Sequence, residues 1–293
     1  MTKTNFSKVK DLKKMVILLF TMVVFSGFFV PPSSITSFNV FAEDIPGTSG
    51  DDILVGTDDN DNIDSGDGND QNSGGLGDDT IDSGEGGDEN YGDNRIGTGV
   101  GGNDNINSGP GDDYNYGDNG FGADGDGGED VINSGDGVDQ NVGDNRDGAG
   151  NGGDDTINSA AGNDLNVGDN YEGDGDGGND VINSGDGDDI NYGDNYVGNG
   201  EGGDDTINSG DGDDTNYGQG GDDTINSGDG DDTNVAGDGD DTVTGGGGSD
   251  TTDCGKGKDT MTDFQPGQDK IKSCKPTIDK SSLPSTNSPG RNR

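Results

Sequence analysis

The chain has 293 residues, of which 62 are Gly and 62 are Asp or Glu, and its formal net charge is -47. Only 23% of the residues are hydrophobic, so too little apolar surface is available for an ordinary globular core. The charge excludes nucleic acid as a partner and favours cations, and the absence of His removes the commonest general base.

Residues 1–42 have the pattern of a secretory signal peptide. Five Lys precede the apolar run MVILLFTMVVFSGFFV, and cleavage is expected after Ala42. An uncleaved anchor is the alternative, although the sixteen residues of this run would make only roughly 24 Å of helix against a hydrocarbon core of ~30 Å. We therefore expect a secreted, extracellular or cell-surface protein, with no membrane insertion after cleavage.

A nine-residue repeat of the form G-x-D-x-U begins at Gly50 and continues to Met261, where U is the second residue after the Asp. The Asp is present in all twenty blocks, and the Gly in nineteen of them. A linker needs composition but no register, so this strict phase predicts folded structure. The repeated aspartates are Asp52, Asp61, Asp70, Asp79, Asp88, Asp104, Asp113, Asp130, Asp139, Asp155, Asp164, Asp180, Asp189, Asp205, Asp214, Asp223, Asp232, Asp241, Asp250 and Asp259.

The U position alternates between two kinds of residue along the chain. Two successive blocks, nominally 18 residues, therefore make one coil of a solenoid, with one strand on each of two facing sheets. One series is Ile63, Ile81, Ile106, Ile132, Ile157, Ile182, Ile207, Ile225, Val243 and Met261. The other is Leu54, Asn72, Asn90, Asn115, Asn141, Asn166, Asn191, Asn216, Asn234 and Thr252.

The blocks resemble the RTX nonapeptide G-G-x-G-x-D-x-U-x, a calcium-binding repeat. Clear examples are GGGGSDTTD at 245–253 and GDGDDTVTG at 237–245, and DTMTDFQPGQDKI at 259–271 is similar to the end of an RTX array. The resemblance implies an all-β fold over residues 43–272, a right-handed parallel β-roll of about ten coils with Ca²⁺ in the turns. It also implies that the twenty aspartates are calcium ligands, together with backbone oxygens of the adjoining glycines.

Physical chemistry favours the same ligands. Calcium takes six to eight hard oxygens in irregular geometry, and glycine permits the positive φ that lets a short turn aim several carbonyls inward. Some sixty carboxylates repel one another in the metal-free chain. Because calcium would bind the folded state alone, we expect folding and calcium binding to be one event at millimolar calcium.

Five connections are seven or eight residues longer than the others. They begin at Gly92, Gly117, Gly143, Gly168 and Gly193. Each opens with Gly-Asp-Asn and ends with Gly-x-Gly-Gly-x-Asp, so the metal turn is rebuilt after the extra residues. We expect them to stack along one edge as a ridge, either as plain decoration or as a recognition surface with variable tips. The Asp that follows each opening Gly could bind further calcium.

The asparagine series allows two orientations. Inward side chains would form an amide ladder that satisfies polar groups which are costly to bury. A one-residue slip would instead turn the next residues inward, namely Tyr116, Val142, Val167, Tyr192, Tyr217 and Val235. The uniform spacing from Asp to U favours the ladder.

Cys254 and Cys274 are the only cysteines, and in an exported chain they favour one disulfide. A redox or metal-binding pair is the alternative, but no partner ligand accompanies them. Residues 273–293 are expected to form a polar, disordered tail.

The sequence predicts a secreted or surface calcium-binding protein with a structural, matrix or adhesion role. The alternative is a recognition module that binds a glycan, a protein partner or ice through the loop ridge or rows of Asn. An enzyme is disfavoured, because no nucleophile–base pair stands out and the carboxylate pairs recur in register.

Overall fold

The computed structural model describes residues 44–276 except 98, 123–124 and 199. The expected signal peptide and the part of the expected tail from residue 277 onward lie outside these residues. Within the described ranges, no helix has the length and apolar character needed to cross a membrane.

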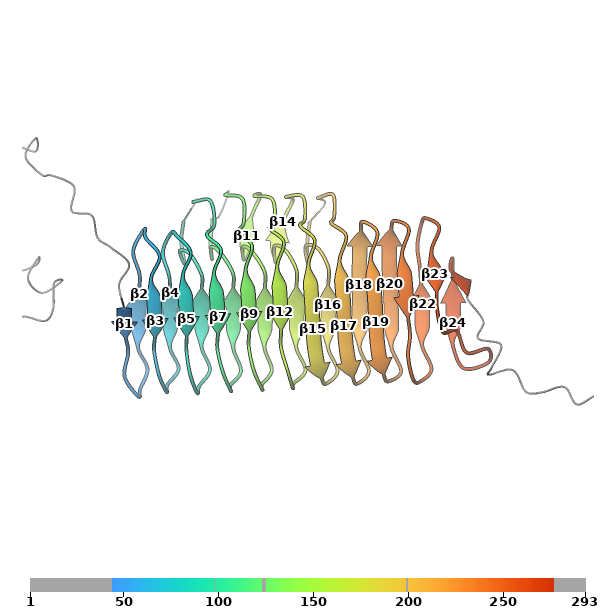
Figure 1. Cartoon of the computed structure of the whole chain (residues 1–293), viewed down its shortest axis with the longest axis horizontal. Helices are drawn as coiled ribbons and strands as arrows, with labels where there is room; N and C mark the ends of the chain where they lie inside the picture. The colour runs from blue at the N-terminus through green and yellow to red at the C-terminus, as the bar shows by residue number, and fades with distance from the viewer. Residues whose placement is uncertain (1–43, 98, 123–124, 199, 277–293) are drawn as a thin grey trace, which may run out of the picture. The chain divides into compact units, whose positions relative to one another are not determined.

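The chain winds between two parallel sheets, which we call the isoleucine sheet and the asparagine sheet (Figure 1). The isoleucine sheet contains β1 (Asp44–Pro46), β3 (Asn62–Asp64), β5 (Thr80–Asp82), β7 (Asn105–Asn107), β9 (Val131–Asn133), β12 (Thr156–Asn158), β15 (Val181–Asp186), β17 (Thr206–Asp211), β19 (Thr224–Asp229), β21 (Thr242–Thr244), β23 (Thr260–Met261) and β25 (Lys275–Pro276). The asparagine sheet contains β2 (Ile53–Val55), β4 (Gln71–Ser73), β6 (Glu89–Tyr91), β8 (Tyr114–Tyr116), β10 (Gln140–Val142), β13 (Leu165–Val167), β16 (Ile190–Tyr192), β18 (Thr215–Gly220), β20 (Thr233–Asp238), β22 (Thr251–Asp253) and β24 (Lys270–Lys272).

Each of the twenty blocks forms one strand, and successive blocks alternate between the sheets. The register pairs like with like, so Ile63 lies beside Ile81 and Asn72 lies beside Asn90. The predicted all-β parallel roll is confirmed. Three strands outside the blocks, β1, β24 and β25, bring the sheets to twelve and eleven strands.

The isoleucine series forms a narrow apolar core between the two sheets. Every side chain from Ile63 to Met261 in this series is fully buried. Ala236 and Cys254 join the same cluster. This single apolar column leaves most of the interior to be filled by polar groups.

The asparagine series points into the roll and forms the predicted amide ladder. From Asn72 to Asn216, each side-chain amide nitrogen donates to the amide oxygen of the next coil at 2.9 or 3.0 Å. The ladder runs through Asn72, Asn90, Asn115, Asn141, Asn166, Asn191, Asn216 and Asn234. The inward orientation is therefore confirmed, and the alternative one-residue slip is wrong.

A buried serine column supports this ladder. The hydroxyl of Ser209 donates to the amide oxygen of Asn216 at 2.8 Å, and Ser227 does the same for Asn234. These amide oxygens thus accept one bond from the neighbouring coil and one from their own coil. The remaining buried serines of the column are Ser65, Ser83, Ser108, Ser134, Ser159 and Ser184.

The five long connections fold back over the outer face of the asparagine sheet, which differs from a ridge with free tips. Tyr91, Tyr116, Val142 and Val167 follow the ladder residues and point outward, yet each is at most 2% exposed. Their cover comes from the loops, since the guanidinium of Arg146 lies 5.7 Å from the centre of the Tyr116 ring. A second apolar cluster therefore lies outside the roll.

The long connections also pair with one another. β11 (Asp147–Gly148) and β14 (Glu172–Gly173) form a short parallel pair above the asparagine sheet (Figure 1). Parallel bridges join Ile96 to Phe121 and Glu172 to Val197. The loops stack in step with the coils, as predicted.

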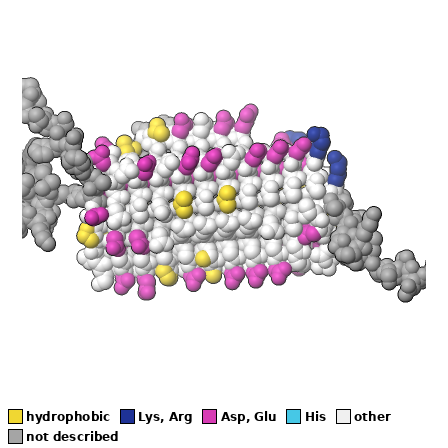
Figure 2. Space-filling model, viewed as in Figure 1, with side chains coloured by type: hydrophobic (Ala, Val, Ile, Leu, Met, Phe, Trp, Pro, Cys, Tyr) yellow, Lys and Arg dark blue, Asp and Glu magenta, His cyan; other side chains and the backbone are white. Residues whose placement is uncertain are grey.

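Acidic side chains follow the upper and lower borders of the molecule in rows, while basic side chains gather near the C-terminal strands (Figure 2). Lys256 pairs with Asp238, and Lys258 pairs with Asp240 at 3.2 Å. These pairs are largely exposed and contribute little stability. Across most of the described surface the carboxylates therefore need counter-ions from solution.

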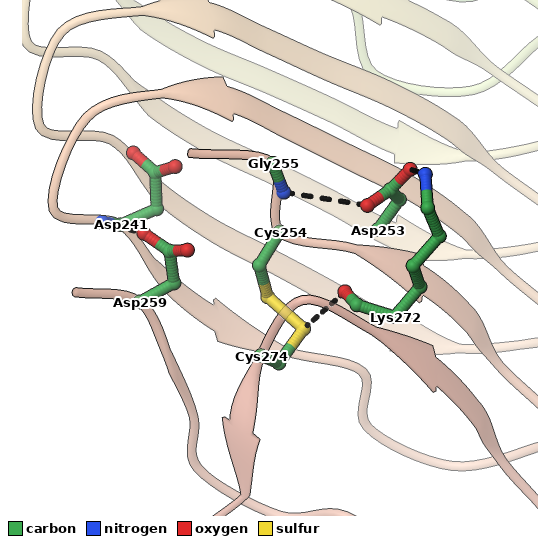
Figure 3. Close-up of a disulfide and its surroundings, with 7 residues drawn as sticks. All are labelled: Asp241, Asp253, Cys254, Gly255, Asp259, Lys272 and Cys274. Carbon is green, nitrogen blue, oxygen red and sulfur yellow. Dashed lines mark hydrogen bonds and ion pairs between the residues drawn. A yellow bond between two sulfur atoms is a disulfide. The ribbon is translucent and has the colours of Figure 1, made fainter. Parts of the chain in front are cut away.

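The predicted disulfide between Cys254 and Cys274 is confirmed (Figure 3). It connects the end of β22 to the segment between β24 and β25, beside the ion pair of Lys272 with Asp253. The two cysteines are 20 residues apart. Closing a loop of this length restricts the unfolded chain and stabilises the last coil by about 3 kcal/mol.

Candidate calcium-binding turns

The repeated aspartates form two columns, one on each edge where the chain passes between the sheets. The short edge joins the isoleucine strand to the asparagine strand of a coil, and the loop edge carries the long connections. Asp52, Asp70, Asp88, Asp113, Asp139, Asp164, Asp189, Asp214, Asp232 and Asp250 lie on the short edge. Asp61, Asp79, Asp104, Asp130, Asp155, Asp180, Asp205, Asp223, Asp241 and Asp259 lie on the loop edge.

Backbone hydrogen bonds hold the carboxylates in these columns. The backbone N–H of Asp189 donates to Oδ1 of Asp214, and the N–H of Asp214 donates to Oδ1 of Asp232, each at 2.9 Å. On the loop edge, Asp205 donates in the same way to Asp223 at 2.9 Å. From Asp70 and Asp79 onward, the preceding coil thus fixes the direction of each motif carboxylate.

Among the residues that the structure describes, the other oxygen of almost every motif carboxylate has no hydrogen-bond donor. Asp52 and Asp61 differ, because Thr48 and Thr57 donate to their Oδ2 atoms. A buried anionic oxygen without a donor is costly, so it requires a proton or a cation. The Oδ2 atoms concerned belong to Asp70, Asp79, Asp88, Asp104, Asp113, Asp130, Asp139, Asp155, Asp164, Asp180, Asp189, Asp205, Asp214, Asp223, Asp232, Asp241, Asp250 and Asp259.

Glycines give the turns the close backbone approach that this arrangement needs. In the turn before Asp214, Gly210 and Gly212 have φ values of +107° and +144°, which L-residues rarely adopt. On the loop edge, a Cβ on Gly218 would overlap Oδ2 of Asp223. The glycines of the repeat therefore leave room for carbonyl and carboxylate oxygens between coils.

In the metal-free protein, burial raises the pKa of the motif carboxyl groups in the middle of both columns. Desolvation raises the pKa of Asp113 and Asp214 to about 7, and that of Asp223 to about 8. Since an unfolded Asp titrates near about 3.9, protonation stabilises the metal-free fold fully below that pH. This contribution is lost as the pH rises through the raised pKa values. At neutral pH a cation must take the place of the protons.

Sequence reasoning missed one further block. Asp269 is 8% exposed, and its Oδ1 accepts the backbone N–H of Asp250 at 3.4 Å, which extends the short-edge column. The pattern Gly267-x-Asp269-x-Ile271 satisfies the repeat and could have revealed it. The serine column was also not predicted, although a Ser recurs two residues after U in the isoleucine strands.

Two stacked parallel sheets with aspartate columns in Gly-rich turns define a parallel β-roll of the calcium-binding type. Four copies of the RTX calcium-binding nonapeptide repeat match the chain, at residues 46–81, 149–165, 199–233 and 226–261. The matched segments therefore carry repeats of a calcium-binding family. No curated protein matches the chain.

Proposed function

We propose that this protein acts outside the cell as a structural element of a matrix, a coat or an adhesive surface, and that calcium makes it rigid. The motif carboxylate oxygens that are buried without a donor carry this proposal. A roll that becomes ordered only with calcium would be ordered where calcium is millimolar, as in extracellular fluid. The signal-peptide pattern of residues 1–42 supports the same location.

The proposed ligands are the twenty motif aspartates and the turn carbonyls beside them. Their donor set fits calcium, because it consists of carboxylate and carbonyl oxygens and contains no nitrogen or sulfur. When bound, calcium neutralises carboxylates of adjacent coils. Asp269 extends the proposed set at the C-terminal end of the short-edge column.

Counting bound ions tests the ligand assignment. We expect the wild-type secreted chain to bind about two calcium ions per coil at saturation, since each edge offers hard oxygens. Asp214→Asn should weaken calcium binding at its turn, because Asp214 is 1% exposed and its Oδ2 has no donor. Asp213→Asn is the matched control, since it removes the same charge from the exposed neighbour. Equilibrium dialysis with metal analysis gives both counts, and equal losses in the two variants would contradict the assignment.

A recognition role is the second candidate, and one surface feature favours it. A depression of about 550 Å³ over the asparagine sheet is lined in part by Tyr114, Tyr116, Gln140, Arg146 and Tyr171. Tyr114 is 53% exposed. Aromatic faces beside amide and guanidinium groups suit a sugar or a polar peptide.

A binding screen separates the two candidates. The calcium-loaded protein would be screened against glycans and surface fractions, alongside a variant in which the five loops are replaced by the regular turn that begins at Gly218. A recognition role predicts specific binding that disappears with the loops. A purely structural role predicts the same weak retention for both proteins.

A further inference from the structure

Each long connection places an additional aspartate inside the loop edge. The N–H of Gly75, in a regular turn, donates to the carbonyl oxygen of Asp93 at 3.1 Å. The N–H of Asp93 donates to the carbonyl oxygen of Asp118 at 3.4 Å. Asp93 and Asp118 therefore occupy the second glycine position of the regular turn, and the loop is inserted after them. Both side chains are fully buried.

The preceding coil leaves space for these carboxylates. A Cβ on Gly101 would overlap Oδ1 of Asp118, and a Cβ on Gly127 would overlap Oδ1 of Asp144. Each of these glycines is the first of the Gly-Gly pair that ends a loop. The Gly-Gly pair therefore does more than form the turn, because it also leaves room for the loop aspartate of the next coil.

Three carboxylates meet at the first of these positions. Asp93, Asp104 and Asp118 each place one carboxylate oxygen within 4.8 Å of the others, and all three are buried. Within the described chain, Asp93 Oδ1, Asp104 Oδ2 and Asp118 Oδ1 have no hydrogen-bond donor. Their other oxygens accept backbone N–H groups. Asp79 donates to Asp104 Oδ1 at 2.6 Å, and Gly102 and Gly128 donate to the Oδ2 atoms of Asp93 and Asp118 at 3.3 and 3.0 Å.

No ion pair formed by the described residues balances the charges at this cluster. The ion pair of Arg95 with Glu89 lies on the outside of the asparagine sheet, and the other ion pairs of the described residues lie near the C-terminal strands. Three converging buried carboxylates without a cation repel one another strongly. A site of this size that offers only hard oxygen ligands suits calcium.

We propose that Asp93 and Asp118 converge on the motif ligand Asp104 to bind one more calcium ion, in addition to the ions of the repeat turns. Asp144 and Asp169 continue the column of loop aspartates after Asp118 through the same backbone hydrogen bonds. Among the described residues, the close convergence of three carboxylates is found at Asp93, Asp104 and Asp118 alone. The site goes beyond the proposed function, because the regular turn has Gly75 where this site has Asp93. The site depends on the proposed function in one respect, which is that calcium must fold the chain.

Asp93→Asn tests the site, because Asp93 belongs to the first loop and its amide oxygen would still accept the N–H of Gly102. At saturating calcium we expect the full chain to bind one ion fewer, with an unchanged circular-dichroism spectrum. Asp126→Asn is the matched control, since Asp126 is an exposed loop aspartate and its loss should leave the count unchanged. Native mass spectrometry and metal analysis measure the ions.

A second variant keeps the test valid if the first variant misfolds. Asp93→Gly restores the residue of the regular turn and should also bind one ion fewer. If either folded variant retains the full wild-type count, the proposal is wrong and the carboxyl groups share protons instead. Failure of the general calcium proposal would look different, because the wild-type chain itself would then bind no calcium and remain unchanged on titration.

Discussion

In a calcium chelator at neutral pH, the secreted chain should lose its β structure, and millimolar calcium should restore it. The physical reason lies in the motif aspartates, whose buried Oδ2 atoms have no donor within the described chain. Without a cation these carboxylates repel one another along both edges, and the single apolar column of the roll offers little to oppose them. Far-ultraviolet circular dichroism during a calcium titration measures the transition.

Magnesium provides the control for this experiment. It demands a smaller octahedral site and gives up its water reluctantly, so the same concentration of magnesium should restore less structure. A spectrum that is identical in chelator and in calcium would show that the roll folds without metal. In that case the carboxyl groups would have to be protonated or screened by monovalent ions.

Truncation of the amide ladder should destabilise the calcium-loaded roll far more than truncation of the tyrosine beside it. Asn216→Ala removes the acceptor of Asn191 and Ser209 and the donor to Asn234. Each buried group left without a partner costs about 1–3 kcal/mol, so the total loss should be several times that of an exposed substitution. The free energy of unfolding in denaturant at saturating calcium measures the effect.

Tyr217→Ala is the matched comparison, because Tyr217 is adjacent and points outward. Its ring stacks on Tyr192 at 4.6 Å between centroids, which is worth only about 0.5–1.5 kcal/mol beyond the area it buries. A larger loss from Tyr217→Ala than from Asn216→Ala would mean that the strand is turned by one residue in solution.

The strict phase of the repeat made most of this fold predictable. Because the Asp recurs with a fixed distance to U, the alternation of Ile and Asn predicted two sheets, the pairing of every second block and the inward direction of Asn216. These are local and periodic properties, and each coil repeats them. The structure follows them at each of the twenty blocks.

The path of the long connections was harder to predict from the sequence. Their cover over the asparagine sheet depends on contacts such as Arg146 with Tyr116 and Tyr196 with Tyr192, which differ from coil to coil. A signal was nevertheless present, because Tyr91, Val142 and Val167 are large residues at a position that faces outward. Apolar outward residues in the looped coils predict a covering layer.

The ends of the array were the other difficulty. Asp269 lies ten residues after Asp259 instead of nine, and the intervening segment contains a Pro and a Phe that break the repeat. The sequence offered the loop aspartates as further calcium ligands, but their burial could not be deduced from spacing. It follows from the way the Gly-Gly pair of one coil receives the carboxylate of the next.

Neighbouring coils of 18, 25 or 26 residues stack with the same pairing of strands, the same carboxylate column and the same amide ladder. A connection can therefore lengthen without disturbing the layers above and below it. In a molecule where each layer contacts mainly its two neighbours, stability grows by nearly equal increments per layer. Duplication or deletion of a whole two-block module should then change the length of the protein without requiring any new kind of contact, which makes length itself an easily inherited and easily altered trait.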